Sequence, residues 1–400
     1  MQDVFIYDCA RTPRGRRRGQ LHEVAPHELL ATLLRALPER TGVDPADVTD
    51  LLAGCVTPIR DQGYNVAEAA LAAAEWPDVV AAAQVNRYCA SGLETVHQAA
   101  ARIAAGYDDL IVAGGVEGMS RVPLDSDGGP LLTNPELILA SGTLPQGVAA
   151  DLIASKEGFT REALDAYAVE SQRRCAEAMA AGHFDRSLVP VDDGIGITLL
   201  ERDSHPRPDT DPEALARLPA AFAKTGALGF DELALSRYPQ VAYVDHVHTA
   251  GNSSGVVDGA GVVLVGNAAA GERLEGKRRA RVRAIAVASS DATVKLLGMI
   301  PAAERALARA GVDITDVDLI EVNEAFAAVP LVFLKHFSVD HARVNVNGGA
   351  IALGHPVGAT GVILLGTLVD ELERRDATLG LVALCAGGGQ GIAAVVERVA

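Results

Sequence analysis

The sequence predicts an α/β protein built from two similar halves, each containing βαβ units, with a long segment inserted into the first half. A chain of 400 residues exceeds one ordinary core. Its hydrophobic share is 49% and its aromatic share only 4%, as expected where helices pack closely on parallel strands. The third observation is an internal repeat. Together these features lead us to expect a mainly parallel sheet in each half.

The repeat consists of three pairs of stretches that occur in the same order in both halves. Each half has an acidic turn leading into a strand, an apolar residue followed by asparagine, and an apolar strand with glycines after it. The pairs are residues 47–52 with 316–320, 85–86 with 344–345, and 110–115 with 381–389. A duplicated fold of this kind places loops from both halves at one shared cleft, near the strand ends.

Local patterns give the elements of the first half. Apolar runs predict strands, helical spacing of apolar residues predicts helices, and Gly or Pro ends them. In chain order we expect a strand at 3–9, a helix at 27–37, a short strand near Cys55, a helix at 65–74, a strand at 79–85, a helix from 93 that Gly106 closes, and a strand at 109–113.

The stretch from 119 to about 244 has a different character. It is rich in proline and contains a clear helix at 161–181, so we expect an insertion that lies over the core rather than forming it. The charged segment 271–279 marks the boundary between the halves. The expected units are an N-terminal half at 1–120, the inserted loop domain at 121–245, the rest of the first half at 246–272 and a C-terminal half at 273–400.

Composition limits the partners and the compartment. The formal charge of -17 gives no general attraction for nucleic acid or for an anionic membrane. The five cysteines are scattered and form no C-x-x-C pair, which favours a reducing compartment over a disulfide framework or a zinc site. No signal peptide is visible, and the uncharged stretch 344–369 contains polar residues and glycines unsuited to lipid. We therefore expect a cytoplasmic protein without a transmembrane span.

Cys89 is the residue around which the chain is organised. An apolar strand ends before it at Val85 and a helix follows from Leu93, so Cys89 lies where a buried strand turns into a helix N-terminus. Unpaired N–H groups and the positive end of the helix dipole favour a thiolate over a thiol there. A nucleophilic role is one interpretation, and a small buried residue at a tight turn is the other.

Three polar clusters lie in apolar surroundings in the second half. They are NEAF at 323–326, NGGAIALGHPVGATG at 347–361 and CAGGGQG at 385–391. Taken singly, Asn323 could cap a helix, His355 could be a turn histidine and Cys385 could fill the core. Together they supply a base for a nucleophilic cysteine, a second thiol that moves a proton at carbon, and exposed N–H groups on glycines.

Other chemistries find less support. The G-x-S-x-G motif of serine hydrolases is absent, and no metal-ligand spacing occurs among the ten histidines. The basic stretch 11–19 is either a solvated surface loop or a phosphate-facing patch.

These motifs resemble those of the thiolases over essentially the whole chain. Residues 86–92 are similar to the family's nucleophile segment, and 323–326, 354–356 and 385–391 are similar to its three C-terminal motifs. The resemblance implies a five-layered αβαβα fold of two similar halves, with an inserted loop domain that binds substrate. It also implies a homodimer or homotetramer that acts on CoA thioesters, with coenzyme A as a substrate and no permanently bound cofactor.

The resemblance also implies roles for single residues. Cys89 is the nucleophile that becomes acylated, His355 takes its proton and then helps to hold an oxyanion, and Cys385 is the acid and base at the α-carbon. Asn323 holds a water in that oxyanion hole, and the N–H groups of Cys89 and Gly387 form a second one. The expected CoA contacts are Ser254, Ala250, Ala325, Phe326 and, towards the adenine, Arg207.

Departures from the family pattern bear on the substrate. Short-chain biosynthetic thiolases usually have His-Met-Gly where this chain has Pro145-Gln146-Gly147, and Ala214 stands where they often have a serine that contacts the coenzyme. The segment 226–248 is also longer. These differences favour a degradative 3-ketoacyl-CoA thiolase of β-oxidation over a biosynthetic acetoacetyl-CoA thiolase. A degradative enzyme is compatible with a partner subunit that carries the preceding steps.

Two alternatives differ in class. A condensing enzyme that uses acyl carrier protein shares the doubled fold, but it pairs its cysteine with two histidines, and Cys385 stands where the second would be expected. A scaffold that only binds coenzyme A would need none of the four residues Cys89, His355, Cys385 and Asn323.

Overall fold

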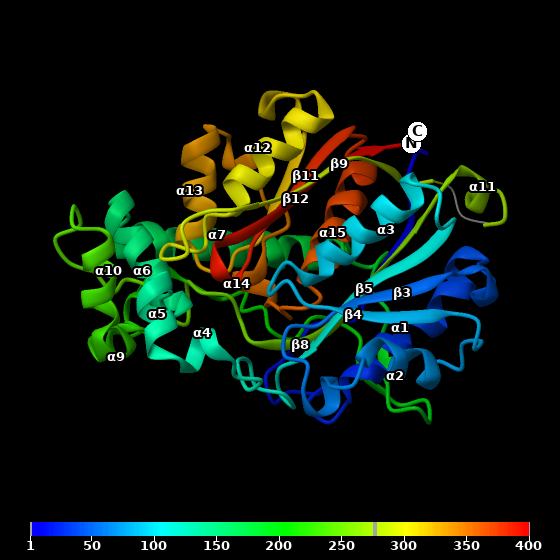
Figure 1. The fold of residues 1–400 in the computed structure, drawn as a ribbon, viewed down its shortest axis with the longest axis horizontal. Helices are drawn as coiled ribbons and strands as arrows, with labels where there is room; N and C mark the ends of the chain where they lie inside the picture. The colour runs from blue at the N-terminus through cyan, green and yellow to red at the C-terminus, as the bar shows by residue number, and fades with distance from the viewer. Residues whose placement is uncertain (1, 275–277, 400) are drawn as a thin grey trace.

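The computed structural model describes residues 2–274 and 278–399, and its elements form five layers (Figure 1). Helices cover both outer faces, and two further helices fill the space between the two sheets. One buried cluster lies under each outer helix layer, and a third joins the central helices to both sheets. The outer helices are α1 (Pro26–Thr41) and α2 (Val66–Ala73) on one face and α12 (Met299–Ala310) and α13 (Ala328–Phe337) on the other, and the central pair is α3 (Ser91–Ala104) and α15 (Thr360–Arg374). The five-layered αβαβα prediction is confirmed.

The strands follow one hydrogen-bonded order, β10-β11-β12-β9-β1-β8-β5-β3-β4, and β2 pairs with β8. Between the described parts of β1 and β9, the pairs Phe5 with Arg281 and Ile6 with Ala280 join the two halves. The strands are β1 (Phe5–Arg11), β2 (Gly15–Arg16), β3 (Asp50–Gly54), β4 (Ala81–Val85), β5 (Leu110–Gly118), β8 (Val257–Gly266), β9 (Ala280–Ser289), β10 (Leu319–Val322), β11 (Leu379–Cys385) and β12 (Gln390–Arg398).

Both halves repeat one strand order. The series β4-β3-β5-β8-β1 matches β10-β11-β12-β9, and the place of β4 in the second half is taken by Val344, which bridges to Ile320 of β10. Of the boundary segment 271–279 predicted between them, residues 275–277 lie outside the described part of the chain.

The prediction of mainly parallel sheets is wrong. The pairs β3–β4, β3–β5 and β10–β11 are parallel, but the pairs that involve β8 or β12 are antiparallel. One strand in each half therefore runs against the others. In the second half the cause is local, since β12 follows β11 after the short turn at Gly387–Gly389 and so tight a connection reverses the chain.

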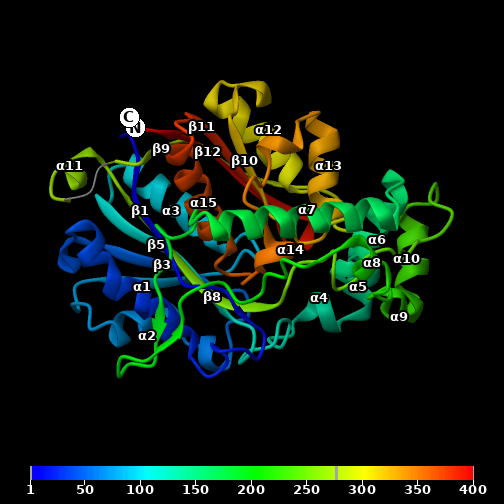
Figure 2. The same cartoon turned by 180° about the vertical axis from the view of Figure 1, so that it is seen from behind.

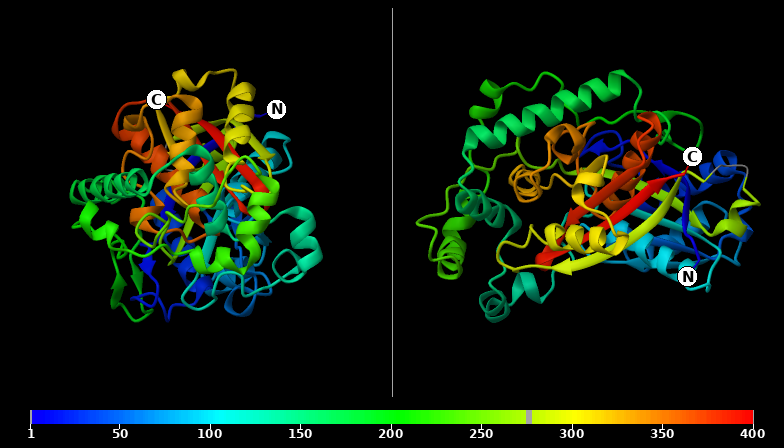
Figure 3. Two further views of the ribbon diagram at one scale, coloured as in Figure 1. Left: turned by 90° about the vertical axis from the view of Figure 1, so that its left-hand side faces the viewer. Right: turned by 90° about the horizontal axis from the view of Figure 1, so that it is seen from above.

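The inserted segment contributes to the core. Its helices gather at one end of the layers, and α7 runs along the back (Figure 2; Figure 3, right). Val148 of α6 and Tyr167 of α7 belong to the same buried cluster as Phe333 and Leu381 of the second half, so the expectation that the insertion only lies over the core is wrong. Its elements are α4 (Pro130–Thr133), α5 (Pro135–Ser141), α6 (Gln146–Glu157), α7 (Arg161–Ala180), β6 (Val191–Asp192), β7 (Thr198–Leu200), α8 (Pro212–Ala216), α9 (Ala223–Thr225) and α10 (Asp231–Arg237).

The remaining α-helices of the described chain are two short ones, α11 (Ala268–Gly271) and α14 (Ala350–Leu353). One stretch, Pro135–Glu157, is long and apolar enough to cross a membrane by length and composition. It is divided into α5 and α6 by Gly142, with φ of 66°, and by Pro145. Residues 147–154 of α6 are buried against the second half, whereas α5 has no buried residue, so this stretch is a short surface helix, a turn and a core helix.

Candidate active site

The turn that carries Cys89 joins the edge strand β4 to helix α3. The strand is half-exposed rather than buried, contrary to the prediction, because β4 has a neighbour on one side only. Tyr88 has a φ of 49°, which is uncommon for a bulky residue. The Arg87 N–H donates to Ser91 Oγ at 2.8 Å, and that hydroxyl donates to the Tyr88 carbonyl. These bonds hold the turn, and Cys89 is 6% exposed.

His355 lies in the loop before helix α15, in a defined tautomer. Its Nδ1 is 2.6 Å from the hydroxyl of Thr360, which also lies 2.9 Å from the carbonyl oxygen of Pro356. A carbonyl only accepts, so Thr360 donates to Pro356 and accepts from Nδ1–H. Nε2 is then unprotonated, as a base requires. Burial, and next the charge of Arg14, lower the pKa of His355 to about 3.

Asn323, directly after β10, is the polar neighbour of this base. Its Nδ2 lies 3.3 Å from Nε2 of His355, and its own N–H donates to the carbonyl of Ala383 at 3.1 Å. The side chain is 1% exposed, and its Oδ1 has no partner among the described residues. A buried amide oxygen without a partner is costly, and a bound water or substrate group would satisfy it.

Glycines let the starts of the two central helices meet. A Cβ at Gly115 would lie 2.2 Å from the carbonyl oxygen of Gly358, and one at Gly92 would lie 2.8 Å from the same atom. No side chain fits such contacts, so glycine is required at both positions. The loop between His355 and Gly358 is therefore held against the first turn of α3, directly after Cys89.

Glu117, in β5, stabilises the same junction between the two helix starts. The sequence pattern did not indicate this role. One carboxylate oxygen accepts from the N–H groups of Val56 at 2.9 Å and Gly358 at 3.0 Å. The other accepts from the Thr57 N–H at 3.2 Å and from Gln62 Nε2 at 2.6 Å. Glu117 thus links both halves beside Cys89, and burial raises the pKa of its carboxyl to about 7. A single Glu in a glycine-rich strand gives no local signal of this role.

The turn after Cys385 packs on the turn of Cys89. A Cβ at Gly387 would lie 2.8 Å from Cγ of Tyr88, and Arg87 Nη1 donates to Gln390 Oε1 at 2.9 Å. The structure therefore brings together the four catalytic segments predicted from the sequence, around Cys89, His355, Asn323 and Cys385.

Burial favours the protonated form of both thiols. Burial raises the pKa of Cys89 to about 12, although its own N–H and the side chain of Gln146 favour the anion. Burial, and next the neighbouring Cys89, raise the pKa of Cys385. The N–H groups at the helix start favour the thiolate of Cys89, as expected, but burial opposes them and raises the pKa of the thiol. A base must take the proton.

Four of the residues predicted to contact CoA belong to two adjoining segments. The N–H of Ser254 donates to the carbonyl of Ala325 at 3.0 Å, and Ser253 forms an antiparallel bridge with Phe326. Ala250 is exposed near the start of the same segment. Asn323 begins the second segment, so the expected CoA contacts adjoin one of the predicted catalytic residues.

Two arginines of the basic stretch 11–19 lie inside the protein. Arg11 is buried in a bidentate pair with Asp203, both N–O distances being 2.8 Å, and Arg14 is buried and donates to the Gly354 carbonyl at 3.1 Å. For these two, both interpretations of the stretch 11–19, surface loop and phosphate patch, are wrong. Arg207 is exposed, its N–H donates to Gln172 Oε1 at 2.9 Å, and within 2–274 and 278–399 no hydrogen bond joins it to the other expected CoA contacts.

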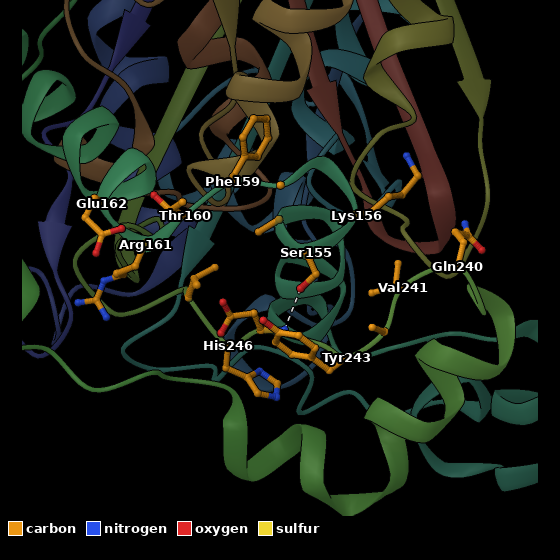
Figure 4. A pocket seen from close by; sticks show the side chains of 15 residues that line it. Ser155, Lys156, Phe159, Thr160, Arg161, Glu162, Gln240, Val241, Tyr243 and His246 are labelled. Atoms are coloured by element: carbon orange, nitrogen blue, oxygen red, sulfur yellow. Dashed lines mark hydrogen bonds between the residues drawn. The ribbon is translucent and has the colours of Figure 1, made fainter.

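A pocket of about 650 Å³ lies between the end of α6, the start of α7 and the segment 240–247 (Figure 4). Lys156, Tyr243 and His246 are among its lining residues, and the Ser155 hydroxyl accepts from the Asp245 N–H at 2.8 Å. None of the predicted site residues lines it. Among the described residues no group of three or more His, Cys, Asp or Glu is placed to hold a metal ion.

A doubled αβαβα fold, with a cysteine and a histidine at the starts of the two central helices and a second cysteine on the facing turn, defines a class of acyltransferases. The chain belongs to the thiolase family: residues 4–229 match the family model "Thiolase, N-terminal domain" and residues 276–398 match "Thiolase, C-terminal domain". Acyl transfer by a thiolase is therefore its activity.

Curated relatives agree over the full length. The chain is 38% identical to a 3-ketoacyl-CoA thiolase of Colwellia psychrerythraea, with 100% of both chains covered. It is 39% identical to proteins of the same name from Saccharophagus degradans, with 100% of this chain and 99% of the relative covered, and from Shewanella frigidimarina, with 100% of both covered.

Proposed function

We propose that this thiolase cleaves a 3-ketoacyl-CoA with free coenzyme A, giving acetyl-CoA and an acyl-CoA two carbons shorter. The contact between the Cys89 turn, the His355 loop and the Gly387 turn carries the proposal. The name 3-ketoacyl-CoA thiolase of the relatives supports the substrate, and fatty-acid β-oxidation is the pathway that produces it. The reverse reaction, condensation of two acetyl-CoA molecules, uses the same groups.

The first half-reaction begins at the neutral thiol of Cys89. Nε2 of His355 takes the thiol proton, and the sulfur attacks the 3-keto carbon of the substrate. The bond between the α- and β-carbons then breaks, its electron pair forms the enolate of acetyl-CoA, and Cys385 protonates the α-carbon. Acetyl-CoA leaves, and the shortened acyl group remains on Cys89 as a thioester.

The second half-reaction returns the acyl group to coenzyme A. The incoming thiol gives its proton to Cys385 or His355, attacks the acyl carbon on Cys89 and releases the cysteine. The N–H groups of Cys89 and Gly387 hold one oxyanion. The other is held by Nε2–H of His355, once protonated, and by a water on the unpartnered Oδ1 of Asn323.

Coenzyme A binds as a substrate, without a resident cofactor, and lies along Ala250, Ser254, Ala325 and Phe326, with Arg207 towards the adenine. The protein acts in the cytoplasm as a homodimer or homotetramer, and the open edge of β4 is a surface suited to a second copy. A partner subunit that carries the preceding steps of β-oxidation is compatible with this role.

The test combines thiolysis with acyl trapping. The wild type is assayed with acetoacetyl-CoA and with longer 3-ketoacyl-CoA, and faster turnover of the longer chains supports the degradative role. Cys89→Ser should form no stable acyl adduct by mass spectrometry, whereas Cys385→Ser should still be acylated but should lose deuterium uptake at the α-carbon of acetyl-CoA. Full thiolysis by Cys89→Ser, or no acyl adduct on the wild type, would refute the proposal.

A further inference from the structure

Three consecutive arginines, Arg16, Arg17 and Arg18, are exposed at the end of β2 and have no role in the proposed mechanism. Among the residues that the structure describes, no carboxylate lies within 4.0 Å of their guanidinium groups, and their side chains make no hydrogen bond. Three unpaired cations side by side repel one another, and a bound anion would relieve that repulsion. In a chain with a formal charge of -17, such a group of free cations is unusual.

The backbone of these arginines runs beside the segment that we expect to bind coenzyme A. The Arg17 N–H donates to the carbonyl of Val256 at 3.2 Å, and Arg16 pairs with Val257 where β2 and β8 run antiparallel. Ser254, an expected CoA contact, lies two residues before Val256 in the chain. The three arginines therefore border the CoA segment.

A fourth arginine comes from the inserted segment. The Arg16 N–H donates to Oγ of Ser204 at 3.0 Å, which holds the stretch after β7 against β2. Beside this contact is a hollow of about 510 Å³ whose lining includes Gln20, Arg202 and Ser204. Arg202 is exposed and, within the described chain, forms no ion pair. Glu201 also lines the hollow, but the four arginines outnumber it, so the local charge is positive. We call residues 16–18 and 202 the basic cluster.

Coenzyme A has the chemistry that this surface suits. Its 3′-phosphate and diphosphate carry about four negative charges at neutral pH, so the net negative charge of the protein repels it at a distance. Arginine binds phosphate oxygens through two parallel N–H donors. A local positive surface beside the CoA segment opposes the general repulsion. Arg207, which we expect towards the adenine, lies five residues after Arg202, so the basic cluster is near the expected phosphate end of the ligand.

We propose that the basic cluster binds the phosphate groups of coenzyme A and of its thioesters and guides these substrates into the site. This rests on the thiolysis proposed above and adds no chemical step to it. The phosphates are remote from the reacting atoms, so the cluster stabilises the bound substrate and the transition state equally. Its loss raises KM and leaves kcat unchanged. Because the arginines are exposed, salt weakens their effect.

The test varies the phosphates of the acyl acceptor. Thiolysis is measured at saturating acetoacetyl-CoA with CoA, 3′-dephospho-CoA or pantetheine as the acceptor, at low and at high ionic strength. In the wild type, kcat/KM should decrease in that order, and salt should lower it only for the two acceptors that carry phosphate. The double variant with Arg17→Gln and Arg18→Gln should lower kcat/KM for CoA about tenfold at low salt and should leave the value for pantetheine unchanged.

The matched control is the double variant with Arg305→Gln and Arg309→Gln, which changes the net charge equally on the outer helix α12. It should leave kcat/KM unchanged for all three acceptors. The proposal is overturned by an equal loss with CoA and pantetheine, by an equal loss in both double variants, or by wild-type kcat/KM of the Arg17 and Arg18 variant with CoA.

Two further outcomes are also decisive. If pantetheine reacts too slowly to measure, the ratio of CoA to 3′-dephospho-CoA decides, and it should fall towards one in the variant at residues 17 and 18. If the wild type cleaves acetoacetyl-CoA with no acceptor, the thiolysis proposal fails, and calorimetric titration of CoA into both double variants still decides whether the basic cluster binds its phosphates.

Discussion

Replacing Glu117 with Gln tests how the two halves are fastened beside the catalytic residues. The carboxylate is 0% exposed and receives four N–H donors, two at each oxygen, from Val56, Gly358, Thr57 and Gln62. Glutamine keeps the size of the side chain but has only one acceptor oxygen. Whichever way its amide turns, an NH₂ group faces two N–H donors.

The size of the effect follows from these four bonds. Two buried N–H donors lose their acceptor, and each unsatisfied donor costs about 1–3 kcal/mol. Glu117→Gln should therefore lower the free energy of unfolding by about 2–6 kcal/mol. That is a large part of the 5–15 kcal/mol or so by which proteins are stable. Because Gly358 lies three residues after His355, kcat should fall as well.

Urea unfolding measures this loss of free energy of unfolding. It is carried out at pH 8, above the pKa of about 7 to which burial raises Glu117. Glu321→Gln is the matched control. Glu321 is 2% exposed, its Oε2 has no partner among the described residues, and burial raises its pKa well above the usual value. Burial favours its neutral form, which an amide resembles in size and charge, so we expect Glu321→Gln to cost little stability. Equal stability of Glu117→Gln and wild type, or an equal loss in both variants, would refute the reasoning.

Three further predictions concern the same site. Thr360→Val removes the acceptor of the Nδ1–H of His355, so the imidazole loses its fixed tautomer. We expect kcat to fall by about 100-fold with KM little changed. If Thr360 were only structural, the substitution would lower stability instead. Gly358→Ala places a Cβ 2.6–2.7 Å from three oxygen atoms and should cost about 1–3 kcal/mol or more in thermal unfolding; wild-type stability would contradict the packing. With a Cys89 pKa of about 12, iodoacetamide labelling of Cys89, followed by peptide mass spectrometry, should accelerate about tenfold per pH unit from 6 to 9, and a plateau would indicate a thiolate–imidazolium pair.

The sequence could predict what is local or repeated. Three pairs of similar stretches indicate the duplication. The four predicted catalytic segments are short motifs whose residues are adjacent in the chain. Strand direction was harder: the turn Gly387–Gly389 is a local signal that β12 reverses, but β8 is reached only after the long insertion, and no local pattern gives its direction.

Long-range contacts explain the remaining differences. Glu117, Gly358 and Gln62 are far apart in sequence. No pattern near Glu117 therefore predicts that four N–H groups donate to its carboxylate. The charge state of Cys89 is a similar case. The sequence shows the helix start, which favours a thiolate. The desolvation that opposes the thiolate depends on Val56, Met119 and Val357, which belong to three other segments of the chain.

The duplication itself explains why the catalytic groups meet. Helices α3 and α15 occupy the same layer between the two sheets, and their first turns touch: a Cβ at Gly361 of α15 would lie 2.2 Å from the N of Leu93 in α3. Cys89 precedes one helix start and His355 the other, so both positive helix ends face the same small volume. That field disfavours an imidazolium and a bound cation but stabilises a thioester oxyanion. A neutral cysteine–histidine pair at rest, charged only when substrate brings the anion, is what such an arrangement of helix ends requires.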